Sequence, residues 1–204
     1  MHKLTVFIAS AIIAVAGICV VRAQSTPLPT LPQPEIKWEI SAQDNAECTK
    51  LIRKYKGWTK INSKPFQMQP QAAAACAAPM PSQSPRSPHM MKYVTVYVND
   101  LGKKAMTTQK SPIFPVGSII LKEKLSKPDS KHPELMTVMV KREKDFNPGC
   151  GDWEFMVFSG DGKLVTARGK IESCANCHQT LPALSSDYVF RNYYLPEDKR
   201  LALK

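Results

Sequence analysis

Two cysteines and one histidine near the C-terminal end have a spacing that supports a specific chemistry. In "SCANCHQT", Cys174 and Cys177 are three residues apart, and His178 follows the second cysteine directly. Two thiols at this spacing can form thioethers with the two vinyl groups of one haem, and the adjacent imidazole then points at the iron. The segment therefore predicts a single, covalently attached haem c, with His178 as the proximal iron ligand.

Two other uses of such a cysteine pair fit the sequence less well. A structural zinc ion needs four ligands, commonly from two paired clusters, and the chain has no second C-x-x-C and no H-x-x-x-H. A thioredoxin-type redox pair opens a helix within a βαβ pattern. The pair here follows a series of strand-like segments instead, so attachment of haem is the favoured interpretation.

The segments before this motif are predicted to be mostly strands. In "KYVTVYVND" (92–100), valines alternate with tyrosine and threonine, which is typical of a strand. Similar segments follow at short intervals and are separated by proline, glycine and asparagine; they cover 117–125, 134–142, 152–159 and 162–169. Consecutive strands with short links favour an antiparallel sheet. The expected fold class is α+β, a mainly antiparallel sheet with a few helices.

A few helices are expected around this sheet. Helix-start signals at Ser41 and Asp44, followed by apolar residues at helical spacing, predict an amphipathic helix that ends near Lys56. "DLGKKAM" (100–106) predicts a short helix, and the motif itself opens a short helix or turn. Residues 62–91 are rich in proline, serine and alanine, so they are predicted to form a long loop excursion.

The N-terminal residues have the pattern of an export signal. Lys3 precedes an apolar run, and "VRA" ends at Ala23 with a small residue, which predicts a signal peptide over 1–23. A retained membrane anchor is the alternative, because the run approaches spanning length. Residues 24–40 form a proline-rich linker, and residues 41–200 are the expected haem domain. The expected location is therefore the periplasm, with no stable membrane insertion after cleavage.

The chain is strongly basic. It has 28 Lys and Arg against 17 Asp and Glu, a formal net charge of +11 at pH 7. The lysines are scattered and no run of five like charges occurs, so an exported protein that meets a soluble acidic redox partner is favoured, and nucleic acid is not an expected partner.

Three cysteines remain in the expected mature chain after the haem motif is set aside: Cys48, Cys76 and Cys150. An oxidising compartment permits at most one disulfide among them. Cys76 and Cys150 lie in loop-like surroundings and are the first choice, although the sequence leaves the pairing open.

Several segments together resemble the cytochrome P-460 family. They are "KYVTVYVND", "FPVGSIILKEKL", "MVKREKDFNPGCGDWEFMVF", "CANCH" and "DYVFRNYY", in the family's order. The resemblance implies an antiparallel sheet carrying one c-type haem, often as a homodimer. Family enzymes oxidise hydroxylamine and bind nitric oxide, and a lysine bonds covalently to the porphyrin edge. The related cytochrome c-prime-beta proteins are thought to bind nitric oxide without turnover.

The residue of this chain that matches the cross-linking lysine is Lys122 in "ILKEK". It shares a strand face with Ile120 and Lys124, so its face need not be wholly exposed. The alternative interpretation of Lys122 is an ordinary strand lysine in water.

The chain also departs from the hydroxylamine-oxidising members. The resemblance implies a distal carboxylate that handles protons, and the matching position falls near Thr137, with no Asp or Glu in mid-strand. This favours a nitric oxide-binding protein without turnover as an alternative to an enzyme. A simple electron-transfer cytochrome is a further alternative, in which a methionine is the sixth iron ligand; the candidates are Met136, Met139 and Met156.

Overall fold

The computed structural model describes residues 40–68, 92–107, 111–181 and 186–191. All of them belong to one compact unit, Pro34–Lys204. The predicted signal peptide, residues 24–39 of the predicted linker and Cys76 lie outside the described residues. Among the helices of the described part, none has the length and apolar character to span a membrane.

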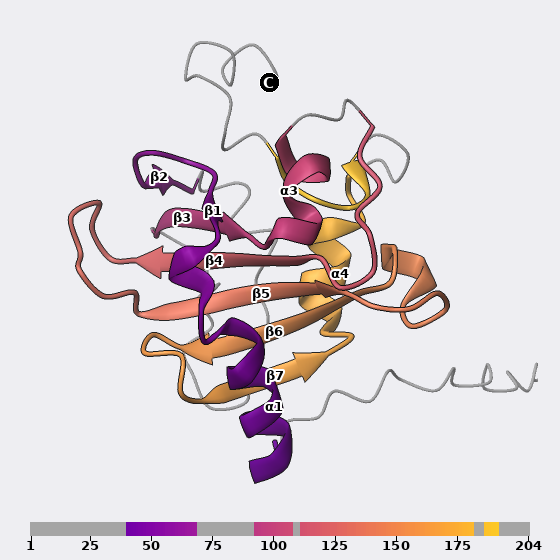
Figure 1. Ribbon diagram of the computed structural model, residues 1–204, viewed down its shortest axis with the longest axis horizontal. Coiled ribbons are helices and arrows are strands. Elements are labelled where there is room, and N and C mark those ends of the chain that lie inside the picture. Colours follow the sequence, from indigo (N-terminus) through magenta and orange to yellow (C-terminus); the bar gives the residue numbers. More distant parts are fainter. Residues whose placement is uncertain (1–39, 69–91, 108–110, 182–185, 192–204) are drawn as a thin grey trace, which may run out of the picture. The chain divides into compact units, whose positions relative to one another are not determined.

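Seven antiparallel strands form a single sheet (Figure 1). Neighbouring strands follow the order β1-β3-β4-β5-β6-β7, and β2 also pairs with β3. The strands are β1 (Thr59–Lys60), β2 (Phe66–Gln67), β3 (Tyr93–Val98), β4 (Ile119–Leu125), β5 (Leu135–Lys141), β6 (Trp153–Ser159) and β7 (Val165–Gly169). The prediction of a mainly antiparallel α+β fold is confirmed.

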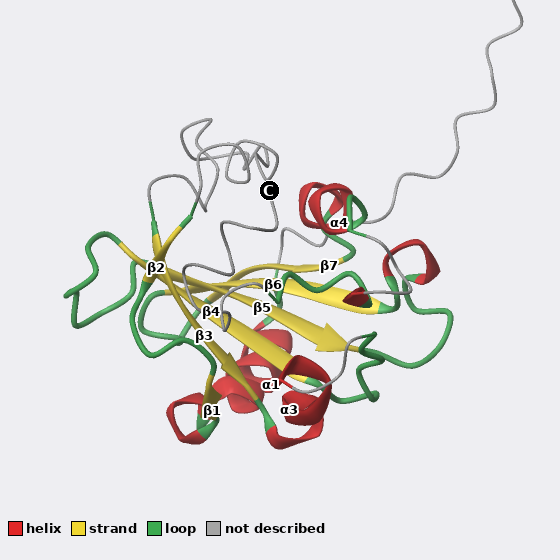
Figure 2. Ribbon diagram, turned by 90° about the horizontal axis from the view of Figure 1, so that it is seen from above, coloured by secondary structure: helices red, strands yellow, loops and turns green. Residues whose placement is uncertain are grey.

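Three described helices accompany the sheet: α1 (Ala42–Ile52), α3 (Asp100–Thr107) and α4 (Glu172–His178). Helices α1 and α4 cover opposite faces, which we name the α1 face and the α4 face (Figure 2). Two short 3₁₀ helices, Tyr55–Gly57 and Pro148–Cys150, lie in the connections. The predicted short helices at 100–106 and at the cysteine motif are confirmed.

Each face of the sheet has its own apolar core because strand side chains alternate. The α4 face carries Val94, Val96, Val98, Ile120, Met139, Phe155, Val157 and Ala167, which pack with Ala175 of α4. The α1 face carries Tyr97, Ile119, Leu121, Met136, Val138, Val140, Met156, Phe158 and Val165, which pack with Cys48 and Ile52 of α1. The face on which a residue lies therefore decides which helix it can contact.

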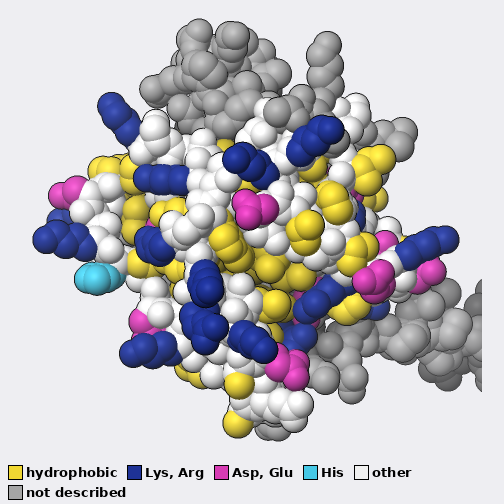
Figure 3. Space-filling model, in the orientation of Figure 1, with side chains coloured by type: hydrophobic (Ala, Val, Ile, Leu, Met, Phe, Trp, Pro, Cys, Tyr) yellow, Lys and Arg dark blue, Asp and Glu magenta, His cyan; other side chains and the backbone are white. Residues whose placement is uncertain are grey.

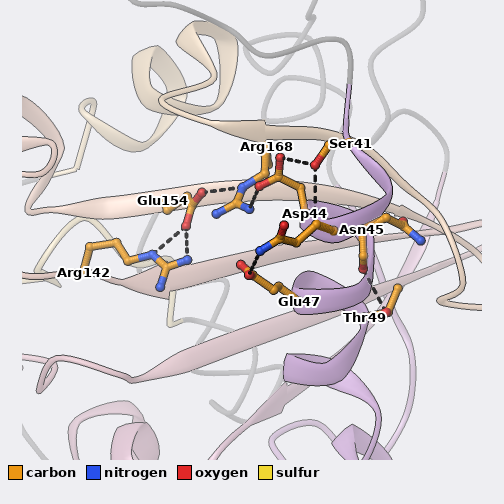
Figure 4. Close-up of polar contacts among 9 residues, drawn as sticks. Ser41, Asp44, Asn45, Glu47, Thr49, Arg142, Glu154 and Arg168 are labelled. Carbon is orange, nitrogen blue, oxygen red and sulfur yellow. Dashed lines mark hydrogen bonds and ion pairs between the residues drawn. The ribbon is translucent and has the colours of Figure 1, made fainter.

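Helix α1 is attached to the sheet by an ionic cluster (Figure 4). The hydroxyl of Ser41 caps the helix by accepting a hydrogen bond from the Asp44 backbone N–H at 3.0 Å. Arg168 of β7 contacts Asp44 at 2.7 Å and Glu154 at 3.1 Å. Arg142 donates to the same Glu154 carboxylate, which is only 2% exposed. The charge of this buried carboxylate is thus matched by two guanidinium groups.

Two local predictions differ from the structure. Helix α1 ends at Ile52 rather than near Lys56. The chain turns instead into a 3₁₀ helix, where Tyr55 Oη and Lys56 Nζ donate to buried Glu123 at 2.6 and 2.5 Å. Strand β1 was not predicted, and β2 lies within the predicted loop 62–91, because a two-residue strand is too short to show alternation.

Basic side chains are spread over the molecule rather than gathered at one place on the face that Figure 3 shows. Hydrophobic and acidic groups lie between them. This distribution agrees with the scattered lysines of the sequence.

Candidate functional site

Helix α4 carries the three residues of the cysteine–histidine motif. It follows β7 and begins at Glu172, so that Cys174, Cys177 and His178 fall within its seven residues. Cys177 and His178 are buried, with 4% and 8% exposure, while Cys174 is half-buried and is a free thiol. The short helix therefore holds two sulfur atoms and one imidazole together against the α4 face.

The His178 ring is held between aromatic side chains and one backbone carbonyl. Its centroid lies 5.3 Å from that of Phe155 on β6 and 5.1 Å from that of Phe190. Its Nδ1 lies 2.5 Å from the carbonyl oxygen of Tyr188. Since a carbonyl only accepts, Nδ1 carries the hydrogen, and the lone pair of Nε2 is available to a metal.

Burial keeps this imidazole neutral. Desolvation, together with the nearby positive charge of Lys122, lowers the pKa of His178 to about 3. A neutral imidazole is the form that binds iron, so the electrostatics of the site favour a ligand role.

Lys122 lies on the α4 face at the same site. It pairs with Val96 on β3 and with Thr137 on β5, and it is only 5% exposed. Its Nζ lies 5.7 Å from the centroid of Phe190, the ring that also contacts His178. The alternative of an ordinary lysine in water is therefore wrong.

A second buried lysine accompanies it. Lys124 follows on the same face of β4 and is fully buried. Burial raises the pKa of Cys174 to about 11, while the charges of Lys122 and Lys124 act in the opposite direction. The fold thus brings two cationic side chains from β4 close to the first cysteine of the motif.

Carboxylates are absent from the strands on this face. Thr137 is half-buried beside Lys122. The buried Glu123 and Glu154 lie on the α1 face, where Lys56 and two arginines bind them. Among the described residues of β3 to β7, no Asp or Glu points to the α4 face, which agrees with the sequence around Thr137.

The three methionine candidates for a sixth ligand separate in the structure. Met136 and Met156 pack in the core of the α1 face, so the sheet lies between them and His178. Met139 alone lies on the α4 face, where it is 4% exposed within the apolar core.

The predicted disulfide between Cys76 and Cys150 is wrong. Cys150 is a free and fully buried thiol, and its Sγ lies 4.0 Å from the carbonyl oxygen of Ala175 in α4. Burial raises the pKa of this thiol to about 12. Cys48 is also free and buried, on the α1 face. The two thiols are core residues of opposite faces.

One group of residues next to the site was not predicted. The carboxylate of Asp187 contacts Lys141 Nζ at 2.7 Å and accepts from the Phe114 backbone N–H at 2.9 Å. The Asp187 carbonyl accepts from Trp153 Nε1 at 2.8 Å. No sequence signal identified these contacts, because they join residues that are 34 to 73 positions apart.

The chemistry of these side chains suits a planar iron-bearing ligand better than a bare ion. The described residues contain no cluster of three or more His, Cys, Asp or Glu that could hold a metal ion by itself. They supply one neutral imidazole, two thiols and aromatic rings, which fit the iron, vinyl groups and plane of a haem, and two buried lysines lie at the same site. These side chains fit the class of haem proteins.

Comparison with known proteins identifies the family. The sequence model of the family Cytochrome P460 matches residues 52–191, more than half of the chain, so this chain belongs to the cytochrome P460 family. It is therefore a haem-binding cytochrome, and the resemblance noted in the sequence is confirmed. No curated protein matches the chain.

Proposed function

We propose that this protein is an exported monohaem c-type cytochrome that binds or oxidises small nitrogen compounds, hydroxylamine or nitric oxide. In this proposal Cys174 and Cys177 attach the haem through thioethers, and His178 Nε2 is the proximal iron ligand. Lys122 is the candidate for a further covalent bond to the porphyrin edge. The location is the periplasm, and a homodimer and a soluble redox partner are part of the same proposal.

The observation that carries this proposal is the meeting of Lys122 and His178 at one aromatic ring, Phe190. The two residues are 56 positions apart in the chain, and the fold brings them to the same ring. Lys122 comes from mid-sheet and His178 from α4, so their common location supports a shared ligand between strand and helix.

The haem, when bound, supplies an iron whose sixth position can take a small ligand. The protein supplies the setting. The Tyr188 carbonyl accepts a hydrogen bond from the Nδ1–H of His178 and so holds the imidazole ring in place. Phe155 and Phe190 pack against that ring and exclude water from it. The Lys122 amine is buried at the same place, where it would be the nitrogen that bonds to a carbon of the porphyrin edge.

A non-catalytic nitric oxide-binding protein is the second candidate. Oxidation of hydroxylamine needs a group that accepts protons near the bound substrate. Thr137, at the matching position, has no titratable group near neutral pH, and the described strands offer no carboxylate on the α4 face. Binding of nitric oxide needs no proton transfer, so this candidate is favoured by the same observation.

A plain electron carrier has less support. Such a protein needs an endogenous sixth ligand, and Met136 and Met156 point away from the site. Met139 is packed among Ile120 and Phe155 in the apolar core of the α4 face.

The deciding experiment is the absorption spectrum of the reduced protein, made in a host with cytochrome maturation machinery, with and without nitric oxide. A band far to the red of ordinary c-type haem supports an enzyme with the Lys122 bond. An ordinary high-spin spectrum that responds to nitric oxide supports the binding protein. A low-spin spectrum indifferent to nitric oxide would contradict both candidates.

Covalent attachment is tested separately by mass spectrometry after denaturation. The wild-type chain should carry the added mass of one haem, and Cys174→Ala with Cys177→Ala should lose it. Cys150→Ala, which removes a buried thiol next to α4, is the matched control and should keep the haem. A colourless wild-type chain without added mass would rule out the proposed function.

A further inference from the structure

We propose that Asp187 is a positioning residue for the proximal iron ligand. It fixes the Tyr188 carbonyl, and through that carbonyl it sets the orientation and donor strength of His178. This inference rests on the proposed role of His178 as an iron ligand.

Asp187 joins three separate parts of the fold to the segment after α4. Its two carboxylate oxygens lie 2.7 and 2.8 Å from Lys141 Nζ on β5, and one of them accepts from the Phe114 backbone N–H. Its carbonyl oxygen accepts from Trp153 Nε1 on β6. With 8% exposure, Asp187 is nearly excluded from water, so its ion pair with Lys141 is only weakly screened.

The backbone at this point needs such support. Asp187 and Tyr188 are consecutive residues with φ of 48° and 60°, in the left-handed region that residues other than glycine rarely adopt. A residue keeps this unfavourable backbone conformation only where contacts with the surrounding structure impose it. The contacts of Asp187, together with a hydrogen bond from the Tyr188 backbone N–H to Ser186 Oγ at 3.1 Å, hold this peptide in place.

Close packing from the other side leaves the segment little freedom. Gly151 has φ of 60°, and a Cβ there would lie 2.6 Å from Tyr188 Cδ2 and 2.9 Å from Asp187 Oδ1. A glycine therefore lets residues 187 and 188 approach the turn before β6. The Asp187 carboxylate and the Tyr188 ring therefore lie directly against this turn.

The Tyr188 carbonyl connects the Asp187 contacts to His178. Its oxygen lies 2.5 Å from His178 Nδ1. A hydrogen bond from the second ring nitrogen orients a metal-bound histidine and raises its basicity. The Tyr188 carbonyl belongs to the next peptide group, so loss of the Asp187 ion pair would act by loosening the backbone at residues 187 and 188. The carbonyl could then shift, and this hydrogen bond would lengthen.

The test uses the haem-loaded, reduced protein and the iron–histidine stretching band in resonance Raman spectra. Asp187→Asn keeps the size of the side chain and removes its charge. It should shift this band to lower frequency, and it should speed the loss of His178 from iron on nitric oxide binding about tenfold. Lys141→Gln, which removes the partner charge, should shift the band in the same direction. It provides the test if Asp187→Asn does not fold.

Glu123→Gln is the matched control, because it removes a buried carboxylate from an ion pair on the α1 face. It should lower stability and leave the band unchanged. An unchanged band in folded Asp187→Asn, or an equal shift in Glu123→Gln, would overturn the inference. If the wild-type protein carries no haem, the proposed function itself is wrong. That result is known before any variant is compared, so the two failures can be told apart.

Discussion

Lys122 and Lys124 project from the same strand onto the α4 face, and both are buried there. Only Lys122 lies over the Phe190 ring that contacts His178. Its charge also has more effect than that of Lys124 on the pKa of His178. At the residue scale, Lys122 is therefore the lysine that the structure places nearer to the proximal ligand.

We predict that Lys122→Arg abolishes the covalent bond to the porphyrin while keeping a positive charge at the site. A guanidinium stays protonated in proteins and cannot act as a nucleophile. The reduced absorption band should move to the position of an ordinary c-type haem, and proteolysis should release a haem peptide without the β4 segment.

Lys124→Arg is the control for this change, and it should retain the red-shifted band and the linked peptide. If the shifted band survives in Lys122→Arg and disappears in Lys124→Arg, the assignment of the lysine is wrong. An ordinary band in the wild-type protein would show that no cross-link forms.

At the element scale, the attachment of α1 depends on Glu154. This carboxylate lies on β6 and binds Arg142 of the β5–β6 connection and Arg168 of β7, which reaches on to Asp44 of α1 (Figure 4). The cluster therefore links one helix to two adjacent strands on the face away from the candidate haem site.

We predict that Glu154→Gln lowers the free energy of unfolding by about 3 kcal/mol, because it leaves two guanidinium groups without their shared buried carboxylate. Urea unfolding followed by circular dichroism measures this change. Lys163→Gln, at the exposed ion pair with Asp161, should leave the midpoint unchanged. Equal midpoints for wild type and Glu154→Gln would contradict a stabilising role for the cluster.

The elements themselves differed in how well the sequence specified them. Alternating residues predicted β3 to β7, because half-buried strands impose a period of two. Ser41 marked the start of α1, since its hydroxyl caps the helix. The end of α1 was predicted wrongly, because Tyr55 and Lys56 continue the helical spacing but turn to bind Glu123 in the fold.

At the scale of the whole molecule, the sheet divides the described residues into two cores with different roles. The α1 face holds its buried charges in matched ion pairs, whereas the α4 face carries the motif residues, Lys122 and Thr137. The sequence identified the motif residues, Lys122 and Thr137, but not the ion pairs of the α1 face. It could not show that Lys141 and Trp153 contact Asp187, because such contacts depend on strand register and on the path of the chain after α4.

The basic charge of the chain is also a property of the whole. The formal net charge is +11, and Lys and Arg are spread over the face that Figure 3 shows. A positive protein attracts anionic reaction partners over distances of about 10 Å at 0.1 M salt, and added salt screens that attraction.

We predict that oxidation of the reduced, haem-loaded protein by ferricyanide, an anion, slows as ionic strength rises, because screening removes the attraction. Oxidation by tris(phenanthroline)cobalt(III), a cation, should accelerate over the same range, because screening removes a repulsion. Stopped-flow absorbance at the reduced haem band measures both rates, and the two reagents control for each other. Rates that change in the same direction with salt would show that the positive charge does not act at the haem edge, and would remove the physical basis for an acidic redox partner.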